Sequence, residues 1–169
     1  MKTLKFGIEI ETVGATRMAL ARAIQSVVGG RATVDGRGAR VDDERGRVWK
    51  VVPDGSLSGG ERSGEVVSPV LEYADIETLQ EVVRSLRKAG ARCDESTGIH
   101  IHVDGSRFNA KTAGNLAKMV HKQERLLEHA LRVSASRLSR YCRSIDGAFM
   151  TRLVGEKPQT KEQLSYAWY

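Results

Sequence analysis

The chain has 169 residues, of which 40% are hydrophobic and 28% are charged, and its formal net charge is +6. This length can bury one core unaided, and this composition excludes a membrane-embedded protein, a fully disordered chain and, with two cysteines, a disulfide scaffold. The positive charge suits an anionic partner, but the basic residues are scattered, so charge alone does not choose among nucleic acid, nucleotide and acidic peptide.

The first five residues contain neither the apolar core nor the cleavage site of a secretory signal. The longest apolar runs are also far too short for a membrane span. We therefore expect a cytoplasmic protein with no membrane partner. We expect Cys93 and Cys142 to be packing residues, because two cysteines without metal-like spacing supply neither a scaffold nor a metal site.

The chain begins with a strand pattern that is followed by a helix pattern. Residues 4–13 alternate strictly between apolar and polar side chains, which predicts a strand. Residues 16–28 carry apolar side chains at helical spacing and lead into Gly29-Gly30, which predicts a helix and its C-terminal end. Residues 31–47 are rich in Gly, Asp and Arg, and predict a hairpin or a flexible loop.

Further strands and amphipathic helices follow along the chain. Strands are predicted at 48–52, 65–68 and 97–104, and helices at 75–89 and 109–131. Gly90 marks the end of the first of these helices, and Asn109 is a candidate N-cap for the second. The pattern fades beyond Val133. We expect a single domain over residues 1–169.

Two carboxylates share one face of the first strand. Successive side chains of a strand point to opposite faces, so Glu9 and Glu11 lie together, about 7 Å apart, opposite an apolar face. Like charges at this spacing repel unless a cation lies near them, and glutamate is uncommon in strands. A cation site and a merely solvated sheet face both remain open for this motif alone.

A second strand places two histidines in the same way. In TGIHIHVD, His100, His102 and Asp104 share one face, while the face with Ile99, Ile101 and Val103 is expected to pack in the core. Glu65 adds a carboxylate at the start of another strand. Several carboxylates with one or two histidines form an oxygen-rich site that suits Mg²⁺ or Mn²⁺ acting on phosphate, and the expected chemistry is phosphoryl or acyl transfer.

Four motifs together resemble the amidoligase family, distant relatives of glutamine synthetase and glutamate–cysteine ligase. They are FGIEIE at 6–11, Trp49 with DGS at 54–56, EVVSPVL at 65–71 and TGIHIHV at 97–103. The resemblance covers residues 4 to about 104. It implies an α+β fold like the glutamine synthetase catalytic domain, with a curved, mainly antiparallel sheet and helices packed on one face.

The resemblance also implies an activity and roles for particular residues. The activity is an ATP-dependent carboxylate–amine ligase that forms an amide through an acyl phosphate, with Mg²⁺ or Mn²⁺ as cofactor. The substrates are small-molecule or peptide carboxylates and amines. Glu9, Glu11 and Glu65 would be metal ligands, His100 a metal or phosphate contact, and His102 a nucleotide or substrate contact, with Asp54, Ser56 and Ser68 on the substrate side.

One departure from the family pattern concerns the end of the chain. The family usually continues with a segment like RYxGLN and a strand like TxEFR, whereas this sequence ends at Tyr166-Ala-Trp-Tyr169. We expect a truncated ligase domain that is weakly active or inactive alone. Last strands supplied by a partner, either a second copy or the C-terminal remainder of the protein, and a loss of catalysis are the alternatives.

Two rival functions remain open at this stage. The basic segment 137–143 suggests a non-catalytic nucleic-acid-binding domain, although the chain has few of the aromatics that such a surface needs. A metal-dependent hydrolase would use the same carboxylates and histidines, with water in place of the amine. ATP dependence separates the ligase from both rivals.

Overall fold

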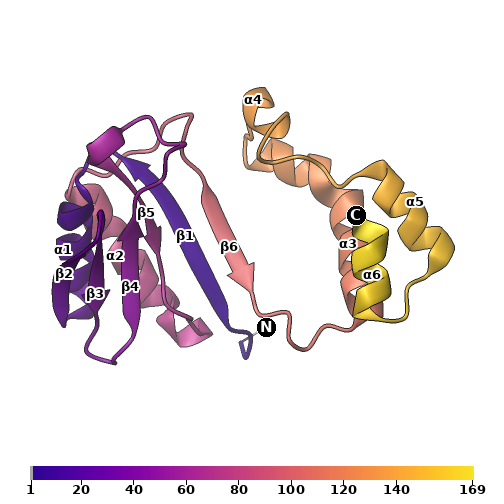
Figure 1. Ribbon diagram of the computed structural model, residues 1–169, viewed down its shortest axis with the longest axis horizontal. Coiled ribbons are helices and arrows are strands. Elements are labelled where there is room, and N and C mark those ends of the chain that lie inside the picture. The colour runs from indigo at the N-terminus through magenta and orange to yellow at the C-terminus, as the bar shows by residue number, and fades with distance from the viewer. Residues whose placement is uncertain (1) are drawn as a thin grey trace. The chain divides into compact units, whose positions relative to one another are not determined.

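The computed structural model describes residues 2–169, which form two compact units divided after Asp104. The first unit contains six strands and two α-helices (Figure 1). The strands are β1 (Phe6–Val13), β2 (Arg31–Asp35), β3 (Gly38–Asp42), β4 (Val48–Val52), β5 (Ser63–Val67) and β6 (Ile99–Val103). The helices are α1 (Arg17–Val28) and α2 (Ile76–Lys88), with short 3₁₀ turns at Gly60–Arg62 and Tyr73–Asp75.

The six strands form one open antiparallel sheet in the order β2-β3-β4-β5-β1-β6. This arrangement confirms the predicted α+β class. The segment 31–42 forms the β2–β3 hairpin, which closes around Gly36 and Arg37. The strand β1 therefore lies between β5 and β6, the two strands that carry the other ionisable motifs.

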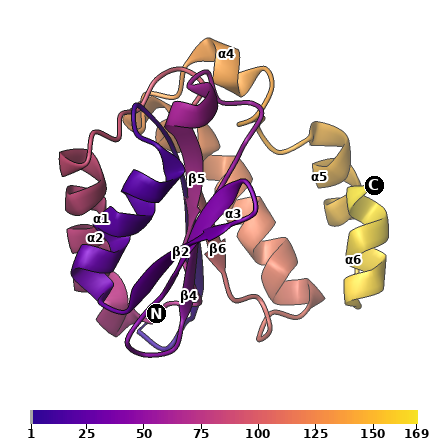
Figure 2. The ribbon, with the colours of Figure 1, turned by 60° about the vertical axis from the view of Figure 1, so that its left-hand side comes forward.

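Both helices cover the same face of the sheet, as Figure 2 shows from the side. Thr16 caps α1 by accepting a hydrogen bond from the Ala19 N–H, and the chain leaves α1 through Gly29 and Gly30, both at positive φ. The core beneath the helices is mainly apolar. It is built from Ile10, Leu20, Ile24, Val41, Trp49, Val51, Val66, Leu71, Val82 and Leu86, among others.

A buried ion-pair network joins the β3–β4 turn to the start of α2. The Asp43 carboxylate accepts hydrogen bonds from the backbone N–H groups of Arg45 and Arg47 and from Arg47 Nε. The guanidinium of Arg47 also donates to Asp75 Oδ1 at 3.0 Å. Burial alone would raise the pKa of Asp43 and of Asp75. The donors to Asp43 outweigh it there, and at Asp75 the Glu72 N–H and then Arg47 outweigh it, so both pKa values lie below their usual range.

The strand β6 corrects one expectation from the sequence. Ile99, Ile101 and Val103 lie on the helix side of the sheet, opposite Ile10, Ile8 and Phe6, yet they are 61%, 68% and 53% exposed. The reason is position, because β6 is the edge strand and α1 packs over β2 to β5. The apolar face of β6 is therefore not a core face in the described chain.

The second unit is helical. Its helices are α3 (Ala110–Ala130), α4 (Ala135–Leu138), α5 (Gly147–Glu156) and α6 (Lys161–Trp168). Asn109 caps α3 as predicted, with its side chain accepting from the Thr112 N–H. Phe149 and Leu153 of α5 pack with Ala167 of α6 as a small core.

Two further findings concern the whole described chain. Cys93 and Cys142 are exposed, so the prediction that they pack in a core is wrong. Both lie in connections between elements, which run over the surface. Within residues 2–169, no helix combines the length and the apolar character that crossing a bilayer requires.

Candidate metal centre

The face of the sheet opposite α1 and α2, called the uncovered face below, carries the ionisable motifs. A row of five successive register partners crosses this face from β3 to β6: Arg40, Lys50, Val67, Glu9 and His100. The next row places Glu65 of β5 opposite Glu11 of β1. The alternation read from the sequence is thus preserved in the sheet, and pairing brings three separate motifs together.

Glu9 is the centre of this group. Its Oε2 lies 3.0 Å from His100 Nδ1 and 3.2 Å from His102 Nε2, so both imidazoles of β6 contact one carboxylate oxygen. The hydrogen bond with His100 is the main cause that lowers the pKa of Glu9, followed by the one with His102. Glu9 is consequently held in its ionised form.

Glu65 has the opposite electrostatic character. Burial is the largest cause that raises its pKa, followed by the negative charge of Glu9. Asp54 and Glu11 act in the same direction, and His100 opposes them. The negative charges of these neighbouring carboxylates repel one another, and a bound cation would offset this repulsion.

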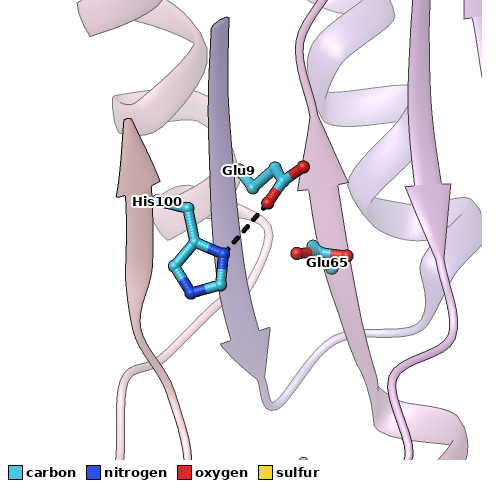
Figure 3. Close-up of side chains that lie close together, drawn as sticks. All are labelled: Glu9, Glu65 and His100. Carbon is cyan, nitrogen blue, oxygen red and sulfur yellow. Dashed lines mark hydrogen bonds and ion pairs between the residues drawn. The ribbon is translucent and has the colours of Figure 1, made fainter. Parts of the chain in front are cut away.

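The geometry of the group fits a divalent cation. Ligand atoms of Glu9, Glu65 and His100 all lie within 4.8 Å of one another, and Figure 3 shows these side chains on neighbouring strands. Glu11 is buried beside them, with Oε1 3.9 Å from His100 Nε2. Two or three carboxylates with one imidazole are donors that suit Mg²⁺ or Mn²⁺, whereas a structural zinc site usually contains cysteine.

The three candidate substrate residues, Asp54, Ser56 and Ser68, differ in their position relative to the carboxylates. The negative charge of Asp54 acts on Glu65, and the Asp54 carboxylate accepts from the Ser56 N–H at 2.8 Å within the turn after β4. The Ser68 hydroxyl accepts a hydrogen bond from the Ile8 N–H and donates one to the Pro69 carbonyl. Its proton is therefore already donated to the backbone. Asp54 is thus near the carboxylates, whereas Ser68 anchors β5 to β1.

The sequence analysis missed Lys50. Its neighbours Trp49 and Val51 are buried in the core, so Lys50 points to the uncovered face. The same alternation that places Glu9 there could have placed Lys50 there as well.

The basic segment of the rival nucleic-acid hypothesis belongs to the second unit. The guanidinium carbons of Arg137 and Arg140 lie 5.3 and 5.8 Å from the ring centre of Tyr141, which is exposed. These contacts are cation–π interactions around one aromatic ring. They form a local cluster around this ring, whereas surfaces that bind single-stranded nucleic acid stack successive bases on several aromatic rings.

Comparison with known proteins adds one match. The family model described as "Putative amidoligase enzyme" matches residues 2–169, both units included. No curated protein and no solved structure matches the chain.

Proposed function

Because this chain belongs to the amidoligase family, we propose that it is an ATP-dependent carboxylate–amine ligase. The observation that carries the proposal is the convergence of Glu9, Glu65 and His100 from three strands on one uncovered sheet face. This donor set suits Mg²⁺ or Mn²⁺, the ions that accompany ATP.

The proposed reaction has two steps. A substrate carboxylate oxygen attacks the γ-phosphorus of ATP, so that an O–P bond forms, ADP leaves and the product is an acyl phosphate. An amine nitrogen then attacks the acyl carbon, phosphate leaves with its electron pair, and the nitrogen loses one proton. The first step is needed because a free carboxylate lacks a leaving group that an amine can displace.

Residues of the uncovered face would divide the work between them. Glu9, Glu11, Glu65 and His100 would hold the cation, which when bound would neutralise charge on the phosphates. His102 orients Glu9 through their 3.2 Å contact. Glu65 must lose its proton to act as a ligand, so cation affinity should increase with pH through its raised pKa.

Calorimetric titration with a non-hydrolysable ATP analogue, with and without Mg²⁺, tests this proposal. We expect binding that requires Mg²⁺ and that falls by about tenfold or more in a Glu9→Gln/Glu11→Gln variant. The matched control is Glu81→Gln, which removes one exposed carboxylate from α2 on the other side of the sheet and should leave binding unchanged.

A second assay separates ligase from hydrolase. In a ligase, continued conversion of ATP to ADP depends on both a carboxylate and an amine, because the amine must remove the acyl phosphate before the next turnover, whereas a hydrolase has no need of ATP. Mg²⁺-independent nucleotide binding, or binding that survives the double substitution, would contradict the proposal.

A further inference from the structure

Lys50 is a free cation on the same face as the proposed metal centre. Its side chain is exposed and forms no hydrogen bond or ion pair with any residue in the described range 2–169. Arg40, its partner on β3, is by contrast paired with Asp42 through two guanidinium nitrogens. Lys50 is therefore the available positive charge in this row of the sheet.

Its distance from the metal centre is set by the register. Lys50 lies opposite Val67, which lies opposite Glu9, so the Cα atoms of Lys50 and Glu9 are two strands, or about 10 Å, apart. Glu65 is its diagonal neighbour, at about 7–8 Å between Cα atoms, yet the two form no ion pair. The ammonium is close enough to serve the same ligand, and it forms no ion pair with the carboxylates of the described residues.

The surface between the two positions is apolar. Val67 lies between Lys50 and Glu9 in their row, and Val52 lies in the next row, opposite Glu65; both valines face the uncovered side and are half-buried. A molecule lying across this part of the sheet face would contact the metal centre at one end, the valine methyl groups in the middle and the Lys50 ammonium at the other end. Such a surface is complementary to a chain with an anionic group at each end.

We propose that Lys50 binds a second anionic group of the carboxylate substrate, and that the substrate is consequently a dicarboxylate or a similar dianion. This inference rests on the proposed ligase function, which places the reacting carboxylate at the metal centre. Lys50 is a specificity residue in this scheme: it holds the end of the substrate that does not react.

Straight-chain dicarboxylates of four to eight carbons, each beside its monoamide, test the proposal. Binding is followed by NMR through the amide signals of Val52 and Val67, with Mg²⁺ and the ATP analogue present. We expect the best diacid to bind about tenfold more tightly than its monoamide, because the amide loses the charge that pairs with the ammonium. In Lys50→Met the diacid should bind only as weakly as the monoamide, and Lys50→Arg should retain the preference.

Lys88→Met is the matched control, since it removes the same charge from α2 on the opposite face and should leave the preference intact. Equal affinities of diacid and monoamide for the unmodified protein would overturn the inference, as would a preference that survives Lys50→Met. If Lys50→Met instead weakens the ATP analogue, Lys50 contacts phosphate and the inference is wrong. If the protein binds no nucleotide, the ligase function itself is wrong. If it binds the ATP analogue but shows no preference for the diacid, only the inference about Lys50 is wrong.

Discussion

Glu9 and His100 face each other across the β1–β6 pair, with 3.0 Å between Glu9 Oε2 and His100 Nδ1. This contact joins the first strand of the chain to a residue 91 positions later. Because it lowers the pKa of Glu9, the carboxylate is ionised well below neutral pH. The stability that this ionised carboxylate provides is present above its ordinary pKa and is lost as pH falls through the lowered one.

Replacing His100 should therefore move the titration of Glu9. In His100→Ala we expect the pKa of Glu9 to rise towards its ordinary value, because its strongest hydrogen bond is lost. NMR of the side-chain carboxyl signals over pH 2–7 measures the pKa of Glu9 in both proteins. His121→Ala, which removes the partner of Glu124 on α3, should leave Glu9 unchanged. An unaltered Glu9 titration in His100→Ala would show that the contact is absent in solution.

Glu65→Gln should stabilise the protein without ligands at pH 8. Ionising Glu65 is costly in the folded state, so its contribution to stability decreases as pH rises from its ordinary pKa through the raised one. At pH 4 both states are mainly protonated and the advantage of glutamine should disappear. Urea denaturation at the two pH values measures this difference, and Glu81→Gln should show no such pH dependence. A Glu65→Gln variant less stable than the unmodified protein at pH 8 would contradict the assignment.

The two arginines of the buried network should differ in importance. Arg47→Met should cost about 3 kcal/mol of unfolding free energy, because it leaves the buried carboxylates of Asp43 and Asp75 without their shared partner. Arg45 also pairs with Asp75, but its side chain is 69% exposed, so Arg45→Met should cost at most about 1 kcal/mol. Chemical denaturation of both variants checks the order, and equal losses would refute the explanation.

Gly7 offers a test of ligand approach. A Cβ added there would lie no closer than 3.9 Å to its neighbours, at Ser68 Oγ, so Gly7→Ala should leave stability unchanged or raise it by about 0.4–1 kcal/mol. The new methyl group would stand beside His102 on the uncovered face. We expect a several-fold weaker affinity for the ATP analogue by calorimetry, with Gly147→Ala in α5 as control. Unchanged affinity would mean that the ligand does not approach β1 at this point.

Much of the first unit could be predicted because its strands and helices have strong periodic patterns. The alternation of residues 6–13 fixes which side chains share a face, and Thr16 with Gly29 bounds α1. The second unit beyond Val133 could not be predicted in the same way, since α4 to α6 are short and their small core comes from contacts between helices.

The sequence by itself determined that Glu9 and Glu11 share a face, and that His100 and His102 share another, because side-chain alternation is a local property of a strand. Only the tertiary structure decided that these faces are one face, with Glu65 opposite Glu11 and His100 opposite Glu9. It also decided that Ile99 and Ile101 are exposed and that Lys50 lies in the same row of the sheet as Glu9, two strands away. Strand order and register determine these relationships, and they arise from pairing between segments far apart in the chain, which no local pattern encodes.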